Sequence, residues 1–324
     1  MSKDFYPSRN IFTKKIVLIT GVHGTGKSML SPIVSSLERC ENLRKDFSIE
    51  HIQILFHYGK ISKDAAKYML GSKVDFMFYD SLIGRNINMR FGDESSLWNS
   101  SDPVNLFSRL ASSKGSSVID EHTEKNDTIF LLDTHNSVWH SQLWFDCFPN
   151  IKIINIQRHP IDVVNSWYKN GLGNDIWNNK INQLLTLKWE NGSVPYYAYG
   201  WEDRYVKSSP IERVILMYNH VINKHYESML NISNINKEKI FDVHFDKIAL
   251  KPSENIRAIC DFLQTNETIQ TPINKEQEYV PRELHPSERD KKFNNIKKIA
   301  DDEFIEIISA QSISYESKYS TLEL

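Results

Sequence analysis

Short runs of apolar residues recur along most of the chain, each bounded by polar or turn-forming residues. Each run is brief and rich in β-branched residues, a pattern typical of strands that are buried on both faces of a parallel sheet. The runs are Lys15 to Thr20, Thr128 to Leu132, Lys152 to Gln157 and Lys239 to Phe245. The pattern therefore predicts four strands that belong to one sheet.

Between and after these strands, apolar residues recur at helical spacing. In the segment Pro252 to Leu263, Ile256 and Ile259 fall on one side of a helix, and the proline is pre-organised for the first helical turn. The other predicted helices are Lys27 to Arg39, Ser141 to Cys147, Pro160 to Tyr168 and Ile211 to Leu230. Strands that alternate with helices predict an α/β fold, in which helices flank a parallel sheet on both faces.

Two long stretches, Asp46 to Asp127 and Gly171 to Pro210, do not follow this alternation. Insertions of such length in a compact domain are often functional loops or lids. The chain has 324 residues, which at about 150 residues per domain allows two domains or one large one, and no linker cleanly divides it. We therefore predict a single domain over residues 1–324, with insertions at about residues 46–127 and 171–210 beside a ligand site, and a helical, polar extension over residues 265–324.

The segment after the first predicted strand is rich in glycine. Residues 21–28 read Gly-Val-His-Gly-Thr-Gly-Lys-Ser and fit the pattern GxxxxGK[ST] in full, between a strand and a helix as this P-loop motif requires. Glycines let the backbone wrap a phosphate with its N–H groups pointing inward, and the start of the helix adds a partial positive charge. The predicted phosphate-binding residues are Gly21, His23, Gly24, Thr25, Gly26, Lys27 and Ser28.

A second candidate anion site follows the third predicted strand. Arg158 stands at the carboxyl end of this strand, where open α/β sheets bind ligands, and Ser166 lies about two helical turns further on. The guanidinium group can contact a phosphate through two nitrogens, and the hydroxyl can add a third hydrogen bond. Together with the loop, these residues predict a nucleotide that carries phosphate at both ends of its ribose.

The two anion sites resemble those of the sulfotransferases that use 3'-phosphoadenosine 5'-phosphosulfate (PAPS). In that family the loop after the first strand holds the 5'-phosphosulfate, and an Arg with a Ser eight residues later holds the 3'-phosphate, which implies these roles for Arg158 and Ser166. Residues 241–248 and 259–263 look like further blocks of the family. The resemblance implies a P-loop fold, PAPS as co-substrate, transfer of the sulfuryl group to a hydroxyl, and no requirement for a metal.

A candidate catalytic base stands at the end of the second predicted strand. In cytosolic sulfotransferases a Lys-Thr-His sequence follows this strand, and its His is the base; His135 matches that His, with Asp133 in place of the Lys. An unperturbed imidazole pKa near 6.5 suits proton transfer at neutral pH. Two other interpretations stay open, since Asp133 could hold Mg²⁺ and His135 could be structural. Other branches use a carboxylate base, for which Asp93 and Glu94 are candidates.

The loop departs from the family pattern at two positions. Many sulfotransferases carry Lys at the position of Gly24 and Thr at the position of Lys27, whereas this chain has the form found in nucleoside triphosphatases. The resemblance implies that Lys27 stabilises the negative charge that develops on the departing nucleotide. An alternative is a kinase that uses ATP and Mg²⁺ through Lys27, Ser28 and Asp133. A third hypothesis is a non-enzymatic, nucleotide-binding regulatory module.

Aromatic residues gather in and beside the second long stretch. They suit stacking on a sugar or another ring-shaped acceptor, and packing onto the sheet explains them equally well. They are Trp167, Trp177, Trp189, Trp201, Tyr168, Tyr196, Tyr197, Tyr199 and Tyr205. A second wall is predicted from Phe76, Phe78, Tyr79, Arg85, Arg90, Phe91 and Trp98. We therefore expect a carbohydrate or another small acceptor.

Charge and cysteine content narrow the partners. The chain has 39 Lys and Arg against 41 Asp and Glu, a net charge of −2, and so lacks the basic excess expected of a protein that grips a nucleic acid. Its three cysteines are widely separated and predict neither a disulfide framework nor a zinc site. The first apolar run is too short for a signal segment or a membrane span. These features predict a cytoplasmic protein without stable membrane insertion.

Overall fold

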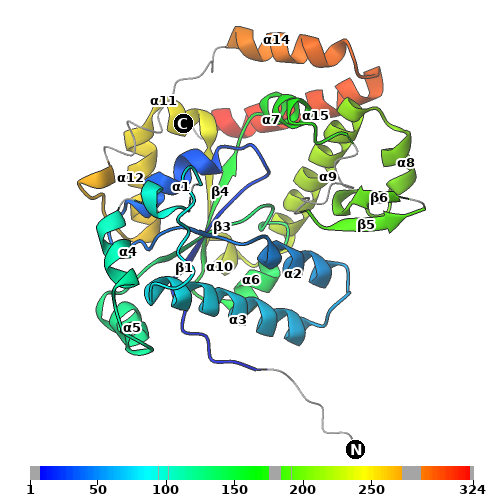
Figure 1. The fold of residues 1–324 in the computed structure, drawn as a ribbon. Coiled ribbons are helices and arrows are strands. Elements are labelled where there is room, and N and C mark those ends of the chain that lie inside the picture. The colour runs from blue at the N-terminus through cyan, green and yellow to red at the C-terminus, as the bar shows by residue number, and fades with distance from the viewer. Residues whose placement is uncertain are drawn as a thin grey trace, which may run out of the picture.

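The computed structural model describes residues 8–93, 95–100, 102–174, 184–190, 192–271 and 286–321. At its centre lies a five-stranded sheet (Figure 1). All neighbouring strands in this sheet are parallel, and their order is β2-β3-β1-β4-β7. The strands are β1 (Ile16–Thr20), β2 (Arg44–Lys45), β3 (Phe130–Asp133), β4 (Lys152–Gln157) and β7 (Ile240–His244). The four predicted strands are confirmed, with small differences at their ends, and β2 is too short to leave a periodic pattern in the sequence.

Helices cover both faces of this sheet, because alternate residues of each strand point to opposite sides. On one side lie α2 (Phe47–His57), α3 (Lys63–Leu82) and α6 (Ser141–Cys147), and on the other α1 (Lys27–Ser35) and α12 (Pro252–Leu263). Ile16 and Leu18 of β1 pack into the first of these layers, whereas Val17 and Ile19 pack into the second. The predicted α/β fold is confirmed.

Helix α1 is shorter than the sequence pattern predicts. It ends at Ser35, whereas the apolar spacing extends the prediction to Arg39. The chain leaves the helix at Ser36, whose hydroxyl donates to the carbonyl of Ile33 at 2.6 Å. Arg39 then has a φ of 64°, a left-handed conformation that no α-helix accommodates. The predicted end was therefore wrong by one helical turn.

The first long stretch contributes to the core as well as to the surface. Helices α2 and α3 pack against the sheet, and the rest forms α4 (Pro103–Leu110), α5 (Ser117–Asp120) and the short turns η1 (Leu97–Asn99) and η2 (Glu121–Lys125). Phe78 is fully buried in α3, and its ring lies 4.7 Å from that of Phe130 on β3. The prediction that Phe78 lines an acceptor wall was therefore wrong, because this face of α3 is needed to cover the sheet.

The second long stretch forms a hairpin beside a group of helices. The hairpin pairs β5 (Thr186–Trp189) with β6 (Gly192–Pro195) in antiparallel fashion, and η4 (Tyr196–Ala198) and α8 (Glu202–Lys207) follow it. The long helix α9 (Pro210–Asn231) then begins with a capping box formed by Ser209 and Glu212. The short helices α10 (Asn234–Lys237) and α11 (Phe245–Leu250) flank β7. Trp177 lies outside the described residues.

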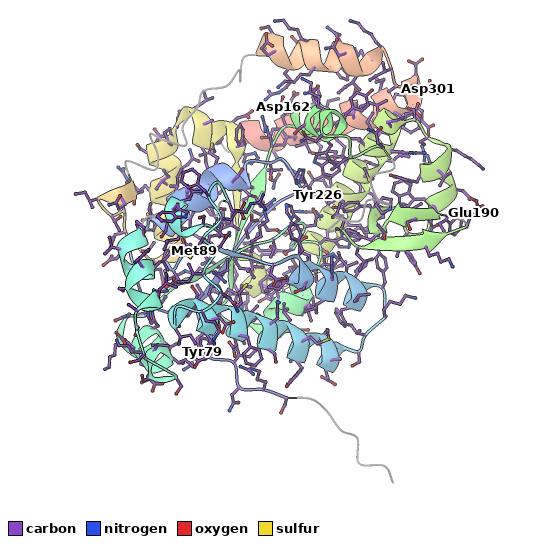
Figure 2. All side chains as sticks on the ribbon, in the orientation of Figure 1. Tyr79, Met89, Asp162, Glu190, Tyr226 and Asp301 are labelled. Carbon is purple, nitrogen blue, oxygen red and sulfur yellow. The ribbon has the colours of Figure 1, made fainter. Side chains whose placement is uncertain are left out.

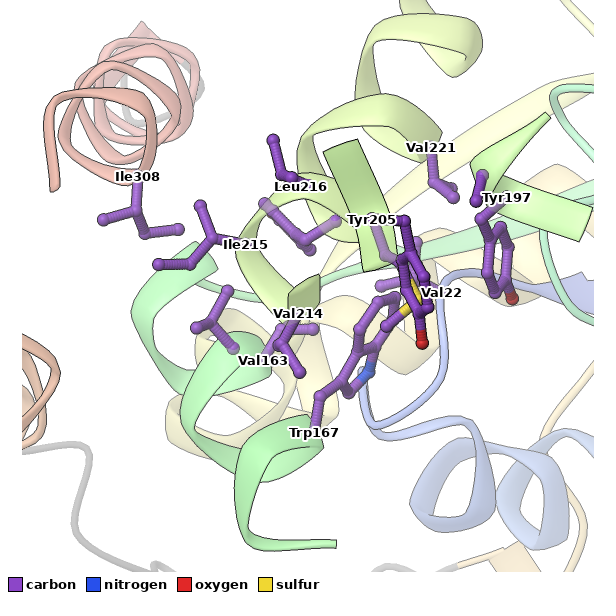
Figure 3. Packing of buried hydrophobic residues seen from close by; sticks show 14 of the residues in the cluster. Val22, Val163, Trp167, Tyr197, Tyr205, Val214, Ile215, Leu216, Val221 and Ile308 are labelled. Carbon is purple, nitrogen blue, oxygen red and sulfur yellow. The ribbon is translucent and has the colours of Figure 1, made fainter. Parts of the chain in front are cut away.

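A third apolar cluster joins the C-terminal helices to α7, the helix that follows β4. Helix α7 (Pro160–Lys169) packs against α9 and α15 (Asp302–Thr321), with Val163, Val214 and Ile308 at the contact (Figure 3). Helix α14 (Pro286–Lys297) lies across α7, where Asp162 pairs with Arg289 at 3.0 Å and with Lys292 (Figure 2). The C-terminal helices thus brace the helix that follows β4.

No helix within the described part of the chain is both long and apolar enough to span a membrane.

Candidate active site

The glycine-rich loop joins β1 to α1 in a conformation that depends on its glycines. Gly21, Gly24 and Gly26 have φ angles of 151°, 76° and 101°. A Cβ atom on Gly26 would collide with the ring of Phe245, and one on Gly21 with the carbonyl oxygen of Ile156. Since only glycine fits both the conformation and the space, the loop wraps tightly at the start of α1, where backbone N–H groups attract an anion.

The polar side chains of the loop support this turn from inside. The hydroxyl of Thr25 donates to the carbonyl of Val22 at 2.9 Å, and the ammonium group of Lys27 lies 3.4 Å from the same oxygen. Lys27 is buried, whereas Ser28 and His23 are exposed. A buried ammonium group at the mouth of a phosphate loop places positive charge where water screens it little.

The two predicted anion sites lie against each other. Arg158 follows β4, and its Nη1 donates to the carbonyl oxygen of Gly24 at 3.2 Å. Ser166 on α7 lies so close to Gly24 that a Cβ there would be 3.4 Å from the serine hydroxyl. Trp167 donates from its Nε1 to the carbonyl of His23 at 2.6 Å. The end of β4 and helix α7, more than 130 residues further along the chain, therefore meet the loop.

Aromatic stacking holds the arginine in this position. The guanidinium carbon of Arg158 lies 4.3 Å from the centre of the Phe245 ring, and the same ring packs against Gly26. The Nε of Arg158 is buried and has no hydrogen-bond partner among the described residues. A pre-oriented guanidinium group with unused donor capacity suits a phosphate ligand.

His135 follows β3 and is contacted by three side chains of helix α2. Oε1 of Glu50 accepts from the backbone N–H of His135 at 2.9 Å and lies 2.9 Å from its ring Nδ1. The side chain of Gln53 donates to the carbonyl of His135 at 3.3 Å, and the Phe47 ring stacks on the imidazole at 6.1 Å and 9°. The His23 ring of the phosphate loop lies 5.7 Å away, so the candidate base borders the loop.

Burial perturbs both members of this pair. It raises the pKa of Glu50 to about 7, against the opposing effects of the backbone N–H of His135 and of the charges of Lys27 and Lys45. Burial also lowers the pKa of His135 well below its usual value, and the charge of Lys27 acts in the same direction. His135 is therefore neutral at physiological pH, which is the state that a general base requires.

The sequence did not reveal Glu50. It lies in the first long stretch, 85 residues before His135, and no local motif marks it. The nearest signal is Asp46, whose side chain accepts from the backbone N–H of Ser48 at 2.8 Å and starts α2. An N-cap of this kind predicts where a helix begins, but not what the helix packs against.

The carboxylates that the sequence offered as alternatives have other partners. Asp133 is buried and pairs with Lys45 of β2 at 3.2 Å. Asp93 is half-exposed, accepts from the amide of Asn88 at 3.2 Å and lies 3.5 Å from Nε of Arg90. Glu94 lies outside the described residues. In the part of the chain that the structure describes, no cluster of three His, Cys, Asp or Glu side chains is arranged to hold a metal ion.

Aromatic residues lie beside Asn136, the residue that follows His135. Asn136 has a φ of 56° and donates from its amide to the hydroxyls of Tyr196 and Tyr197, at 3.1 Å each. Tyr58 in turn donates to the carbonyl of Tyr196 at 2.9 Å. Both Tyr196 and Tyr197 are buried, so most of their surface packs the second stretch onto the domain, whereas Tyr199 is half-exposed.

The other residues predicted to line the acceptor site are also either buried in the core or exposed on the surface. Trp167 and Tyr205 are core residues, whereas Phe76, Phe91 and Trp98 are exposed. The two arginines of the first stretch form ion pairs on the surface, Arg85 with Asp80 at 3.2 Å and Arg90 with Asp93 at 3.5 Å.

These observations define an α/β protein in which a glycine-rich loop of the P-loop type, Arg158 and a neutral His135 lie at the carboxyl ends of adjacent parallel strands. A sequence model described as "Sulfotransferase family" matches residues 97–268, more than half of the chain. The chain belongs to this sulfotransferase family. The matched region contains His135, Arg158 and Ser166, whereas Glu50 and Lys27 precede it.

Solved structures with a similar arrangement are bacterial sulfotransferases. STF1 from Mycobacterium tuberculosis is 10% identical, with 87% of this chain and 77% of that chain covered and a TM-score of 0.42. STF9 from Mycobacterium avium is 11% identical, with 89% and 77% covered and a TM-score of 0.41. A sulfotransferase from Alicyclobacillus acidocaldarius is 13% identical, with 91% and 94% covered and a TM-score of 0.36. No curated protein matches the sequence.

Proposed function

We propose that this sulfotransferase moves the sulfuryl group of PAPS to a hydroxyl of a carbohydrate or another small acceptor. The observation that carries the proposal is the approach of Arg158 to the phosphate loop, 3.2 Å from the carbonyl of Gly24, with Ser166 beside the same glycine. PAPS carries anionic groups on both the 5' and the 3' side of its ribose. Two adjoining cationic sites therefore suit it better than a nucleotide with one phosphate chain.

The donor is held by backbone groups and a few side chains. The loop from Gly21 to Ser28 and the start of α1 bind the 5'-phosphosulfate, with Lys27 as the cation. Arg158 and Ser166 bind the 3'-phosphate, for which the buried Nε of the arginine has a free donor. Because these groups supply the positive charge, we propose that transfer needs no metal ion. The kinase alternative is not favoured, since Asp133 is already paired with Lys45.

Transfer breaks the bond between sulfur and the bridging oxygen of the donor and forms a bond between sulfur and the acceptor oxygen. Negative charge grows on the bridging oxygen, and Lys27 with the loop N–H groups stabilises it. The acceptor proton passes to Nε2 of His135, which is uncharged before the reaction. Adenosine 3',5'-bisphosphate is the second product.

We place the acceptor beside His135, where the neighbouring Asn136 contacts Tyr196 and Tyr197. We also propose a single catalytic domain that acts in the cytoplasm. Burial raises the pKa of the thiols of Cys40 and Cys147 to about 12, which keeps them unreactive.

A thermal-shift panel tests the donor. We expect adenosine 3',5'-bisphosphate without metal to stabilise the protein more than ADP or ADP with Mg²⁺, because a ligand that binds the native state raises its stability. Arg158→Ala should remove this preference, whereas Arg257→Ala, which changes an exposed arginine on α12, should retain it. Stabilisation by ADP with Mg²⁺ alone would overturn the proposal.

A further inference from the structure

We propose that Glu50 is a positioning residue, which holds His135 in the Nδ1–H tautomer so that Nε2 presents its lone pair to the acceptor hydroxyl. The inference rests on the proposed function for the identity of that hydroxyl. It concerns a residue outside the region that the sulfotransferase family model matches.

The hydrogen-bond pattern determines the tautomer. Oε1 of Glu50 lies 2.9 Å from the backbone nitrogen of His135 and 2.9 Å from its Nδ1. A backbone N–H can only donate, so this oxygen acts as an acceptor, and a carboxylate oxygen has a second lone pair for the ring N–H. With the proton on Nδ1, the lone pair of the neutral imidazole is on Nε2, which has no hydrogen-bond partner among the described residues.

Helix α2 holds the imidazole through three side chains on one face. Phe47, Glu50 and Gln53 are spaced three residues apart. Phe47 stacks on the ring of His135, Glu50 accepts from its backbone N–H and contacts its Nδ1, and Gln53 donates to its backbone carbonyl. Asp46 caps the helix and pairs with Lys73 of α3 at 2.7 Å. The base is therefore held by a rigid element of the core and not by a loop.

The pair is buried, which strengthens its electrostatic coupling. The side chains of His135 and Glu50 are 12% and 7% exposed. When Nε2 takes the acceptor proton, the imidazolium keeps its Nδ1–H and stays paired with the Glu50 carboxylate in a medium of low dielectric constant. The charged and titratable groups that act on the pair from neighbouring elements are Lys27 and His23 of the loop, Lys45 of β2, Asp133 of β3, His51 of α2, and Tyr196 and Tyr197.

A carboxylate that titrates near neutral pH has a consequence for the tautomer. Burial raises the pKa of Glu50 to about 7. Below that pH the carboxyl gains a proton, and an Oε1–H that donates to Nδ1 leaves the ring proton on Nε2. We therefore expect the base to be active above about pH 7 and less active below it.

The test is nuclear magnetic resonance of the full-length protein labelled with ¹⁵N at histidine, recorded from pH 5 to 9 without substrates. His135→Gln identifies the His135 signals. In the wild type we expect the Nδ1–H tautomer at pH 8.5 and a change of the ring shifts with a midpoint near pH 7. Glu50→Gln keeps an acceptor oxygen but cannot titrate, so the tautomer should persist and the change near pH 7 should disappear. Glu306→Gln, at an exposed position of α15, is the matched control.

An Nε2–H tautomer in the wild type at pH 8.5, or an unchanged titration in Glu50→Gln, would overturn the inference. Near-ultraviolet circular dichroism of Glu50→Gln establishes that the variant keeps its tertiary packing. The experiment needs neither donor nor acceptor, so it is separate from the donor test. A protein that shows the expected tautomer but does not bind adenosine 3',5'-bisphosphate would count against the proposed function and in favour of the Glu50–His135 geometry.

Discussion

The phosphate loop and the histidine site border each other, and they are built in opposite ways. The loop is eight consecutive residues whose shape follows from its own glycines, as the φ angles of 76° at Gly24 and 101° at Gly26 show. The histidine site depends on a contact between residues 85 positions apart, Glu50 and His135. Conformation within a short segment is encoded locally, whereas the protonation state of His135 is a property of the packing of α2 against β3.

The two regions also differ in the side chains that they require. The loop requires residues without a side chain, because a Cβ on Gly26 would collide with the Phe245 ring. At His135, the backbone N–H, the backbone carbonyl and Nδ1 each have a partner in a defined position, since buried polar groups without one are costly. Substitutions should therefore affect the two regions through different observables.

Loss of the loop cation should have the largest effect. Lys27→Ala is expected to lower turnover by about 10³-fold at saturating donor, because a buried charge no longer stabilises the departing nucleotide. The measurement is the formation of adenosine 3',5'-bisphosphate from PAPS in the presence of carbohydrate and phenol acceptors. Lys60→Ala, at an exposed lysine, is the control. Full turnover of Lys27→Ala would remove Lys27 from the mechanism.

Loss of the candidate base should have the second-largest effect. His135→Gln is expected to reduce turnover by about 10²-fold, because general base catalysis by a positioned side chain contributes about 10² or more. Calorimetric affinity for adenosine 3',5'-bisphosphate should stay within about twofold, since the donor site is formed by the loop and Arg158. His57→Gln, on the same helix as Glu50, is the control. A proportionate loss of bisphosphate affinity would mean that His135 belongs to the donor site.

The glycines of the loop give a prediction on stability. Gly26→Ala should lower the free energy of unfolding by about 2 kcal/mol or more, since the new methyl group is both strained and in collision with Phe245. Gly92→Ala is the matched comparison, because Gly92 also has a positive φ, 94°, but nothing lies within 4 Å of its added Cβ. Its cost should be about 1 kcal/mol. Equal costs in urea denaturation would contradict the steric argument.

The pH dependence should be the smallest effect. Burial raises the pKa of Glu50 to about 7, and the deprotonated form is the one that leaves Nε2 able to accept a proton. Turnover should therefore rise about tenfold between pH 6 and pH 8, as one ionisation with this midpoint requires. The profile of kcat against pH measures it. In Glu50→Gln the limb near pH 7 should vanish, and a rate that falls from pH 6 to pH 8 in the wild type would have the wrong sign.

Much of the fold follows from the sequence. The strands β1, β3 and β4 are short runs buried on both faces, and β7, at the edge of the sheet, is a short, partly buried run. The differences between the predicted and the observed elements also have physical reasons. β2 has two residues and is held by β3, and α1 stops at Ser35 because of the turn that Ser36 and Arg39 make, not because its apolar spacing ends.

The candidate site could be predicted only in part. Gly21 to Ser28, Arg158 and Ser166 form recognisable spacings, because each group is anchored to the end of a strand. Whether an aromatic residue is a wall or a core residue could not be predicted, and Phe78 was assigned to the wrong class. Its surroundings are set by how α3 lies on the sheet, which no residue near position 78 encodes.

The sequence by itself determined the order of most strands and helices and the glycine-rich loop between β1 and α1, because these depend on neighbours within a few residues. It made His135 a candidate base only through the resemblance to a known family. Only the tertiary structure decided that Arg158 and Ser166 meet at Gly24, that Asp133 pairs with Lys45, and that Glu50 holds the imidazole of His135. The reason is that hydrogen bonds, ion pairs and the burial that shifts a pKa act through space. They are set only once the helices have packed on the sheet.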